Sequence, residues 1–376
     1  MGDLAFYPFT FLFVPGLETP LLFLIFNRPA PTARVFEVIR AQRPRQLFIA
    51  ADGARDDRLG EAELVRQTRA IATHVDWACE VKTLFRDTNL GCGAAVSQAI
   101  TWFFDHVEEG IILEDDCLPH PDFFPYCQTL LQRYRHEPRI ATIAGTHFLP
   151  AELAYQHSHY VSKYFQMWGW ATWRRTWQDY DFALSKLSEA EWQALLKRIH
   201  PIPAEAGYWN EIYKTLQTST VDTWDFQMLF SCWRTGGHHV MPGRNLISNL
   251  GYGVDATHTN FASPMGNLPT FPLVVGPEAI SLAPDRTLDS LIFFLRFLES
   301  MTQTWWMEQV LSPEQKLGEA RYELVRKDRM IRQLEREVTE KRRQLLAATR
   351  ALAEASPLTR DVPNPVTGSS SAAILS

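Results

Sequence analysis

Short apolar runs, each followed by polar residues, recur along the first third of the chain. The runs at 21–26, 46–51 and 110–113 contain no charged residue, a pattern typical of strands buried on both faces of a parallel sheet. The segment 80–85 alternates apolar and polar residues and predicts another strand. Between the strands, apolar residues recur at helical spacing, as in 31–40. The order β-α-β-α-β-α-β predicts an α/β fold with a Rossmann-like, mostly parallel sheet and flanking helices.

Polar side chains follow every predicted strand in this part of the chain. Parallel strands end at one edge of a sheet, and open α/β folds bind ligands at that edge, so these residues are predicted to line a ligand site. They are Asn27 and Arg28 after the first strand, Asp52 and Gly53 after the second, residues 87–89 after the third, and Glu114, Asp115 and Asp116 after the fourth.

The acidic triplet Glu114-Asp115-Asp116 carries the most specific chemistry. Three adjacent carboxylates repel one another unless a cation or a polar partner neutralises them. Oxygen ligands of this kind suit Mn²⁺ or Mg²⁺, ions that often bridge to a diphosphate. The triplet therefore favours metal-assisted group transfer from a nucleotide diphosphate. The alternative is a solvated acidic turn that binds nothing.

The pattern changes in the middle of the chain. Residues 168–177 are rich in tryptophan, 188–220 predicts charged helices, and 224–233 predicts a further helix. A glycine-rich stretch follows at 249–258, and the apolar segment 288–306 contains charged residues that make it a buried or interfacial helix rather than a membrane span.

A heptad pattern marks the C-terminal part. Apolar residues repeat every seven positions without a miss, which predicts a coiled-coil helix; they are Leu317, Leu324, Ile331, Val338, Leu345 and Leu352. Because Lys327 and Lys341 interrupt the accompanying positions, the seam is weaker than an ideal zipper, and a lone solvated helix is the alternative.

These changes predict five parts. They are an N-terminal leader segment (1–19), the α/β domain (20–275), a linker with an apolar helix (276–311), the coiled-coil helix (312–355) and a disordered tail (356–376).

Composition excludes several classes of protein. The chain has 376 residues and a formal net charge of −6, so it lacks the basic surplus of a nucleic-acid binder. Its five cysteines are scattered and form no C-x-x-C pair, which favours reduced thiols in the cytoplasm. The first residues lack the basic start and cleavage site of a signal peptide. There is no G-x-G-x-x-G after the first strand and no P-loop motif anywhere, which disfavours dinucleotide and P-loop proteins.

The residues around the triplet resemble a known family. Glu114-Asp115-Asp116 followed by Pro121-Asp122-Phe123-Phe124 and Tyr126 is similar to the E-D-D-x-x-x-x-P-D-F-F-x-Y segment of GT-A glycosyltransferases of the N-acetylglucosaminyltransferase I type, a pattern shared by bacterial hemolysin-like (HlpA-type) proteins. The resemblance covers roughly residues 20–262. It implies a GT-A nucleotide-diphospho-sugar transferase that works in polysaccharide biosynthesis.

The resemblance also implies a role for each matching residue. Asp116 and His258 would contact the metal, Mn²⁺ or Mg²⁺. Asp225 would be the catalytic base that takes the proton of the acceptor hydroxyl. The donor, a UDP-sugar and by resemblance UDP-N-acetylglucosamine, would be bound by Arg28, Asp52, Glu114, Asp115 and Trp170. The loop at Asn89-Leu90-Gly91 departs from the family pattern, which leaves the uridine contact there open. A single displacement of this kind inverts the anomeric centre.

Each of these residues has a simpler interpretation. Asp225 at a helix start could be an N-cap, Asp52-Gly53 a turn, and Arg28 the partner of a local acid. His258 could be an ordinary loop histidine, and Trp170 part of the core. For the whole chain the alternative is a non-catalytic nucleotide-sugar fold that acts through its coiled coil, and a receiver-like phosphoacceptor domain is a third reading.

The expected partners are a UDP-sugar donor and a glycan or other hydroxyl acceptor. The heptad helix predicts self-association, as a homo-oligomer, or docking to a membrane-bound glycan assembly complex, which would place the protein at the periphery of the inner membrane.

Overall fold

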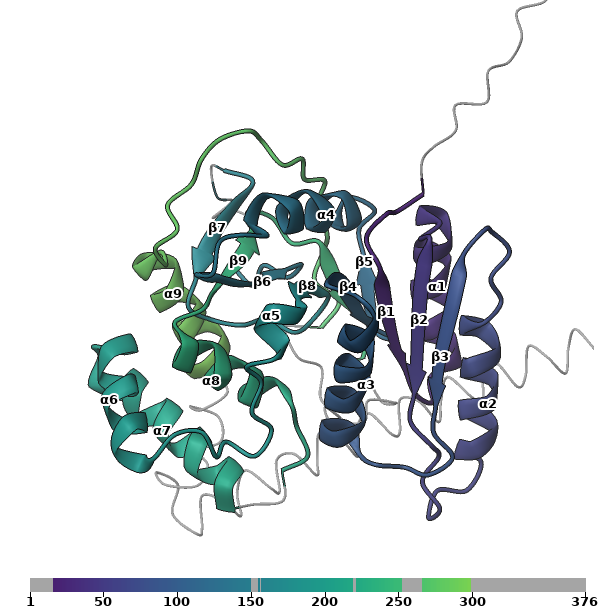
Figure 1. The fold of residues 1–376 in the computed structure, drawn as a ribbon, viewed down its shortest axis with the longest axis horizontal. Helices are drawn as coiled ribbons and strands as arrows, with labels where there is room; N and C mark the ends of the chain where they lie inside the picture. The colour runs from purple at the N-terminus through teal and green to yellow at the C-terminus, as the bar shows by residue number, and fades with distance from the viewer. Residues whose placement is uncertain (1–15, 150–154, 156, 219–220, 252–265, 299–376) are drawn as a thin grey trace, which may run out of the picture. The chain divides into compact units, whose positions relative to one another are not determined.

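A mixed eight-stranded sheet forms the centre of the molecule (Figure 1). The computed structural model describes residues 16–149, 155, 157–218, 221–251 and 266–298. The strands are β1 (Leu21–Ile25), β2 (Gln46–Ala51), β3 (Glu80–Phe85), β4 (Glu109–Glu114), β5 (Cys117–Pro119), β6 (Ile140–Ala144), β7 (His159–Ser162), β8 (Trp170–Trp173), β9 (His238–Pro242) and β10 (Ile247–Asn249). The large sheet has the order β3-β2-β1-β4-β8-β6-β9-β7, and β5 and β10 form a separate ladder.

Most helices lie between these strands, and the first of them includes the segment 31–40 that was predicted to be helical. They are α1 (Pro29–Gln42), α2 (Glu61–Ala72), α3 (Cys92–His106), α4 (Phe123–Tyr134), α5 (Arg174–Trp177), α6 (Glu189–Ile199), α7 (Pro203–Thr218), α8 (Asp225–Thr235), α9 (Arg286–Ile292) and the π-helix η2 (Phe293–Leu298).

Strands β1 to β4 are mutually parallel, as predicted. Leu21 of β1 pairs with Leu47 of β2 on one side and with Ile111 of β4 on the other. The chain therefore builds outward from β1 to β3 and then returns to add β4 on the opposite side of β1. Such a reversal of strand order leaves a crevice at the carboxyl ends of the two strands concerned, here β1 and β4.

Two hydrophobic clusters cover the two faces of the sheet. Alternate residues of β1 belong to different clusters, with Phe23 in one and Leu24 in the other. Helices α1 and α4 pack on the Phe23 side, whereas α3, α7, α8 and η2 pack on the Leu24 side. Burial on both faces was predicted from the uncharged runs, and the prediction of an α/β fold with flanking helices is confirmed.

The second half of the sheet is mixed rather than purely parallel. β8 lies between β4 and β6 and runs antiparallel to both, and β7 runs antiparallel to β9. β6 and β9 keep the direction of β4, so their carboxyl ends lie at the same edge of the sheet. The architecture, a mostly parallel mixed sheet between helices, is consistent with a GT-A-like fold.

Helix starts in the second half follow local sequence signals. α6 begins with a capping box, in which the Ser188 hydroxyl accepts the Glu191 N–H at 3.4 Å and the Glu191 carboxylate accepts the Ser188 N–H at 2.8 Å. The N-cap of α9 is Asp285, whose carboxylate accepts the Thr287 and Leu288 N–H groups. These caps are local, and neither contacts the acidic triplet.

The apolar segment predicted near 288–306 is helical over its described part. α9 and η2 follow one another from 286 to 298, and Ile292, Phe293 and Phe297 are buried in the same cluster as α8. None of the described helices is long and apolar enough to cross a membrane. The leader up to residue 15, the heptad positions and the tail lie outside the described residues.

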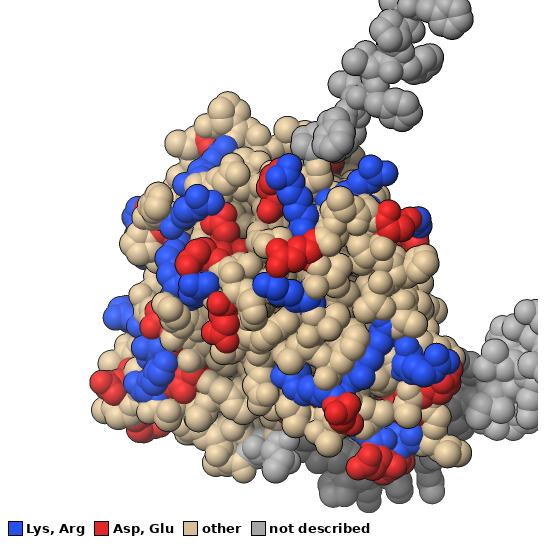
Figure 2. Space-filling view, turned by 45° about the vertical axis from the view of Figure 1, so that its right-hand side comes forward, with Lys and Arg blue, Asp and Glu red and all other residues tan. Residues whose placement is uncertain are grey.

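Basic and acidic side chains are interspersed over the face shown in Figure 2, without a continuous basic surface. This mixture of charges on one face agrees with the formal net charge of −6.

Candidate active site

The acidic triplet lies where β4 ends and the chain turns back. Glu114 is the last residue of β4, Asp115 and Asp116 form the turn, and Cys117 begins β5. β5 pairs with β10, and the Leu250 N–H donates to the Asp116 carbonyl at 2.7 Å. Backbone hydrogen bonds thus anchor the turn and fix its side chains at the carboxyl edge of the sheet.

Arg28, which follows β1, lies directly against this turn. Its Nη1 forms an ion pair with Asp116 and lies 3.8 Å from Asp115 Oδ1. The Phe26 N–H donates to Asp115 Oδ2 at 2.9 Å, which ties the end of β1 to the same carboxylate. The partner of Arg28 is therefore the triplet itself. Arg28 and the triplet are thus in contact at the carboxyl ends of β1 and β4, where the strand order reverses.

Burial and mutual repulsion raise the pKa of Glu114 and Asp115. Burial is the largest cause for Glu114, followed by Asp116 and Asp115, and Arg28 acts in the opposite direction. Burial is also the largest cause for Asp115, with Asp116 raising its pKa and Arg28 lowering it. For Arg28, burial lowers the pKa, but the acids outweigh it and raise the pKa overall. One guanidinium therefore offsets only part of the charge of three carboxylates.

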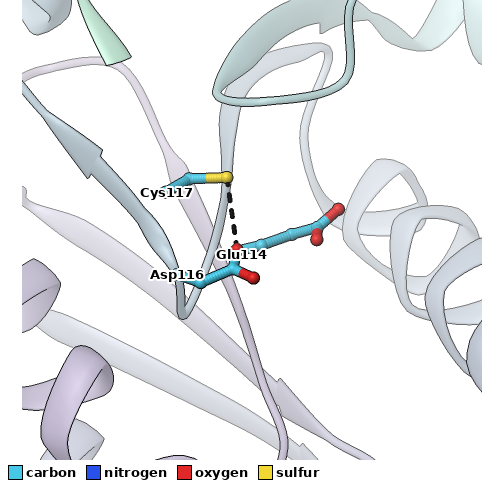
Figure 3. A group of neighbouring side chains, drawn as sticks. All are labelled: Glu114, Asp116 and Cys117. Carbon is cyan, nitrogen blue, oxygen red and sulfur yellow. Dashed lines mark hydrogen bonds between the residues drawn. The ribbon is translucent and has the colours of Figure 1, made fainter. Parts of the chain in front are cut away.

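The donor atoms at this turn fit a hard divalent cation. Glu114, Asp116 and Cys117 each offer an atom, and these atoms lie within 4.8 Å of one another (Figure 3). Burial raises the pKa of Cys117 well above its ordinary value, so the sulfur stays a thiol and lies 3.5 Å from Asp116 Oδ1. The remaining donors are carboxylate oxygens, the ligands that Mn²⁺ and Mg²⁺ prefer. Asp116 and Glu114 are thus the residues that would hold such an ion.

Gly251 lies against the triplet. It is the last residue described before His258, and a Cβ at Gly251 would overlap Asp116 and lie 3.1 Å from Arg28 Nη1. The glycine therefore permits the chain to pass against the acidic turn. His258 itself lies outside the described residues, and its contact with the metal stays a prediction.

Asp52 lies at the end of β2, at the same edge, and its carboxylate is engaged by the loop before α3. It accepts the Leu90 N–H at 2.9 Å, the Gly91 N–H at 3.1 Å and the Gly53 N–H at 3.0 Å. Burial raises its pKa in spite of these bonds. The loop that departs from the family pattern is thus ordered by the residue predicted to contact the uracil. That contact stays a prediction.

Asp225 lies within electrostatic range of the triplet. It is the first residue of α8, and its charge contributes to the raised pKa of Glu114 and of Cys92. The N-cap of α8 is Trp224, so the interpretation of Asp225 as that cap is wrong. Its carboxylate accepts a hydrogen bond from the Thr223 hydroxyl and is partly exposed. The partial exposure leaves this carboxylate accessible from solvent.

Trp170, predicted to bind the donor, is fully buried in the core. It opens β8 and stacks on Trp224, with ring centroids 5.8 Å apart. The antiparallel insertion of β8 between β4 and β6 is the reason, because it places the whole strand inside the sheet. Trp170 is thus a core residue that packs against Trp224, the residue that precedes Asp225.

Sequence reasoning missed two residues that meet at the start of α3. The half-buried Cys92 begins α3. Burial is the largest cause that raises the pKa of its thiol to about 12, and the neighbouring acids add to it. Asp222 accepts the Cys92 and Gly93 N–H groups, each at 2.6 Å. The Gly91-Cys92-Gly93 sequence indicates that another part of the backbone approaches closely here. The sequence does not predict which segment that is.

No protein-family model matches the chain, and no curated protein matches it in sequence. Among solved structures, the chain is similar to Staphylococcus aureus TarS 1–349 with a TM-score of 0.33 and 11% identity, over 61% of this chain and 59% of that chain. It is similar to HddC from Yersinia pseudotuberculosis with a TM-score of 0.28 and 11% identity, over 46% and 86% of the two chains. For a UDP-glucose pyrophosphorylase complexed with UDP-glucose, the TM-score is 0.27 and the identity 11%, over 59% and 90%. Similarities at this level assign no function, which has to come from the site itself.

Proposed function

We propose that this chain is a metal-dependent, inverting glycosyltransferase that moves a sugar from a UDP-sugar to a hydroxyl group of a glycan acceptor. The observation that carries the proposal is the meeting of Arg28 with Asp115 and Asp116 at the reversal of strand order. Open α/β folds bind nucleotides at such a reversal. The sugar favoured by the resemblance of the acidic segment is N-acetylglucosamine.

The charges of the site suit a nucleotide diphosphate only when a cation is added. Glu114, Asp115 and Asp116 face one guanidinium, and a diphosphate would be repelled by the surplus negative charge. A divalent ion bound to Asp116 and Glu114 would remove this repulsion and stabilise the charge of the departing diphosphate as a Lewis acid. Arg28 lies where it can pair with the same phosphates.

Asp225 supplies the remaining chemistry. In a single displacement the acceptor oxygen forms a bond to the anomeric carbon while the bond from that carbon to the phosphate oxygen breaks, and the electron pair leaves with UDP. The hydroxyl proton passes to the Asp225 carboxylate, which acts as general base. Attack from the face opposite the leaving group inverts the anomeric centre. General-base assistance of this kind is worth about 10²–10⁴-fold in rate.

The metal assignment is tested by Asp116→Asn in the full chain. This change removes a charged oxygen ligand and is expected to weaken Mn²⁺-dependent binding of UDP on the order of 100-fold, measured by isothermal titration calorimetry with and without Mn²⁺. Glu63→Gln, an exposed acid on α2 paired with Arg66, is the matched control and should bind UDP as the parent does.

Two results would contradict the proposal. If the Asp116→Asn variant binds UDP as tightly as the parent with Mn²⁺ present, the metal assignment is wrong. If the parent chain binds neither UDP nor a UDP-sugar in a thermal-shift screen with Mn²⁺, the non-catalytic alternative is favoured.

A further inference from the structure

Four successive backbone N–H groups before and within the first turn of α3 are divided between two aspartates. The Leu90 and Gly91 N–H groups donate to Asp52, which follows β2. The Cys92 and Gly93 N–H groups donate to the two oxygens of Asp222, which lies between α7 and α8. The backbone from Leu90 to Gly93 therefore connects the end of β2 with the segment before α8.

Asp222 replaces a cap that α3 lacks in its own sequence. The N-cap residue of α3 is Gly91, which has no side chain to bond the free N–H groups of the first turn. A carboxylate at a helix N-terminus satisfies these groups and interacts favourably with the helix dipole. Because Asp222 is 129 and 130 residues away in sequence from its two partners, the cap joins distant parts of the chain.

The glycines on either side of Cys92 make this contact possible. A Cβ at Gly91 would lie 2.6 Å from Asp222 Oδ2, and Gly91 has a φ of +83° that disfavours other residues. A Cβ at Gly93 would lie 2.7 Å from the Thr223 carbonyl oxygen. Both positions must stay free of side chains for the segment 222–223 to reach α3.

The same segment leads directly to Asp225. The Thr223 hydroxyl donates to the Asp225 carboxylate, and the Gln227 Nε2 donates to the Thr223 carbonyl at 2.9 Å. The turn that begins α8 is thus fixed at one end by α3 and at the other by the helix itself. Cys92, bonded through its N–H to Asp222, is within electrostatic range of Glu114 and Asp225 at once.

We propose that Asp222 is a positioning residue for catalysis: by bonding the first two N–H groups of α3, its carboxylate fixes the start of α8 so that Asp225 faces the acidic triplet. The inference rests on the proposed role of Asp225 as general base. A small displacement of a reacting group lowers turnover far more than it lowers substrate binding. The signature of this role is therefore a loss of kcat at nearly constant affinity for the donor.

The test uses Mn²⁺-dependent hydrolysis of UDP-N-acetylglucosamine, in which water takes the place of the acceptor. Asp222→Ala is expected to lower kcat roughly 10- to 100-fold while KM for the donor and Mn²⁺-dependent UDP binding stay at the parent values. Asp222→Asn, which keeps one acceptor oxygen and is closer to the parent in stability, should lower kcat less. Ser188→Ala, which removes the cap of α6, is the matched control and should lower the melting temperature without changing kcat.

A double variant separates positioning from a purely structural role. If Asp222 acts through Asp225, then Asp222→Ala combined with Asp225→Asn is no slower than Asp225→Asn alone. The inference is overturned if the two losses multiply, or if both Asp222 variants change only the melting temperature, as Ser188→Ala does. Full turnover by Asp225→Asn, or absence of hydrolysis by the parent, would instead overturn the proposed function on which the inference rests.

Discussion

Two groups of charged side chains, one around Glu205 and one around Glu114, differ in how many partners of opposite charge each carboxylate has. Around Glu205 on α7, one carboxylate receives the Lys163 ammonium at 2.7 Å, His200 Nδ1 at 3.2 Å and the Tyr164 hydroxyl. Around Glu114, three carboxylates share one arginine. Glu205, Asp115 and Asp116 are buried and Glu114 is half-buried, and the two groups differ in their charged partners.

The two clusters show opposite electrostatic consequences of that difference. Burial raises the pKa of Glu205, but its three partners outweigh burial and lower the pKa to about 2. At the triplet, burial and the neighbouring acids together raise the pKa of Glu114. A fully paired buried charge supports the fold, whereas a buried surplus of one sign costs stability and is retained where a ligand can neutralise it. The comparison supports the proposed ligand site at the triplet and assigns a structural role to Glu205.

Glu205→Gln should produce the largest change in stability. The substitution leaves Lys163, whose side chain is 14% exposed, without its charged partner. Breaking a buried pair in this way is expected to lower the free energy of unfolding by about 3 kcal/mol, measured by urea denaturation. Glu211→Gln, on the same helix but exposed and paired with Lys214, should leave it unchanged. A loss no larger than that of the control would remove the structural role assigned to Glu205.

Most of the sheet edge could be predicted from sequence, because the strands that carry it are uninterrupted apolar runs. Arg28, Asp115 and Asp116 each follow such a run directly, so the parallel order of β1 and β4 was enough to bring them together. Asp225 was recognised by resemblance, and its position near Glu114 depends on the fold of the second half.

The positions of three other residues could not be predicted, for a different reason in each case. Asp222 bonds N–H groups more than a hundred residues away, and no local pattern encodes that contact. Glu205 belongs to a helix whose charged composition predicts solvent exposure, yet it is only 3% exposed. Trp170 was expected at the surface of the site, but the insertion of β8 as a central antiparallel strand buries it.

The pH dependence of stability should separate matched from unmatched buried acids. Glu205, with its pKa lowered from 4.5 to about 2, contributes stability that is present above pH 4.5 and is lost as the pH falls toward 2. Asp289 on α9 behaves in the opposite way. Burial raises its pKa from 3.8 to about 7, although the Ser162 hydroxyl and the Lys163 N–H bond it.

For Asp289 the folded state binds the proton more tightly than the unfolded state, so stability falls as the pH rises from about 4 through 7. Melting temperatures of the parent and of Asp289→Asn, measured from pH 3 to pH 8, check this. The variant should show a smaller decline between pH 4 and pH 7, and Glu205→Gln should show a smaller loss below pH 4.5. Identical slopes in parent and variants would contradict both assignments.

Glu114→Gln should produce the smallest change, and one of opposite sign to Glu205→Gln. Within the described residues no hydrogen bond reaches the Glu114 carboxylate, and apart from Arg28 the charges around it are acidic. Neutralising it removes the cost of burying the charge and the like-charge repulsion, and is expected to raise the free energy of unfolding in the absence of metal by about 1 kcal/mol. Glu109→Gln, at the other end of β4, breaks the pair with Arg135 and should give no increase in the free energy of unfolding.

Addition of Mn²⁺ should stabilise the parent more than the Glu114→Gln variant, because the ion relieves a repulsion that the variant has already lost. A lower stability of metal-free Glu114→Gln would mean that the triplet is matched by partners in the same way as Glu205, and the argument for a cation there would fail.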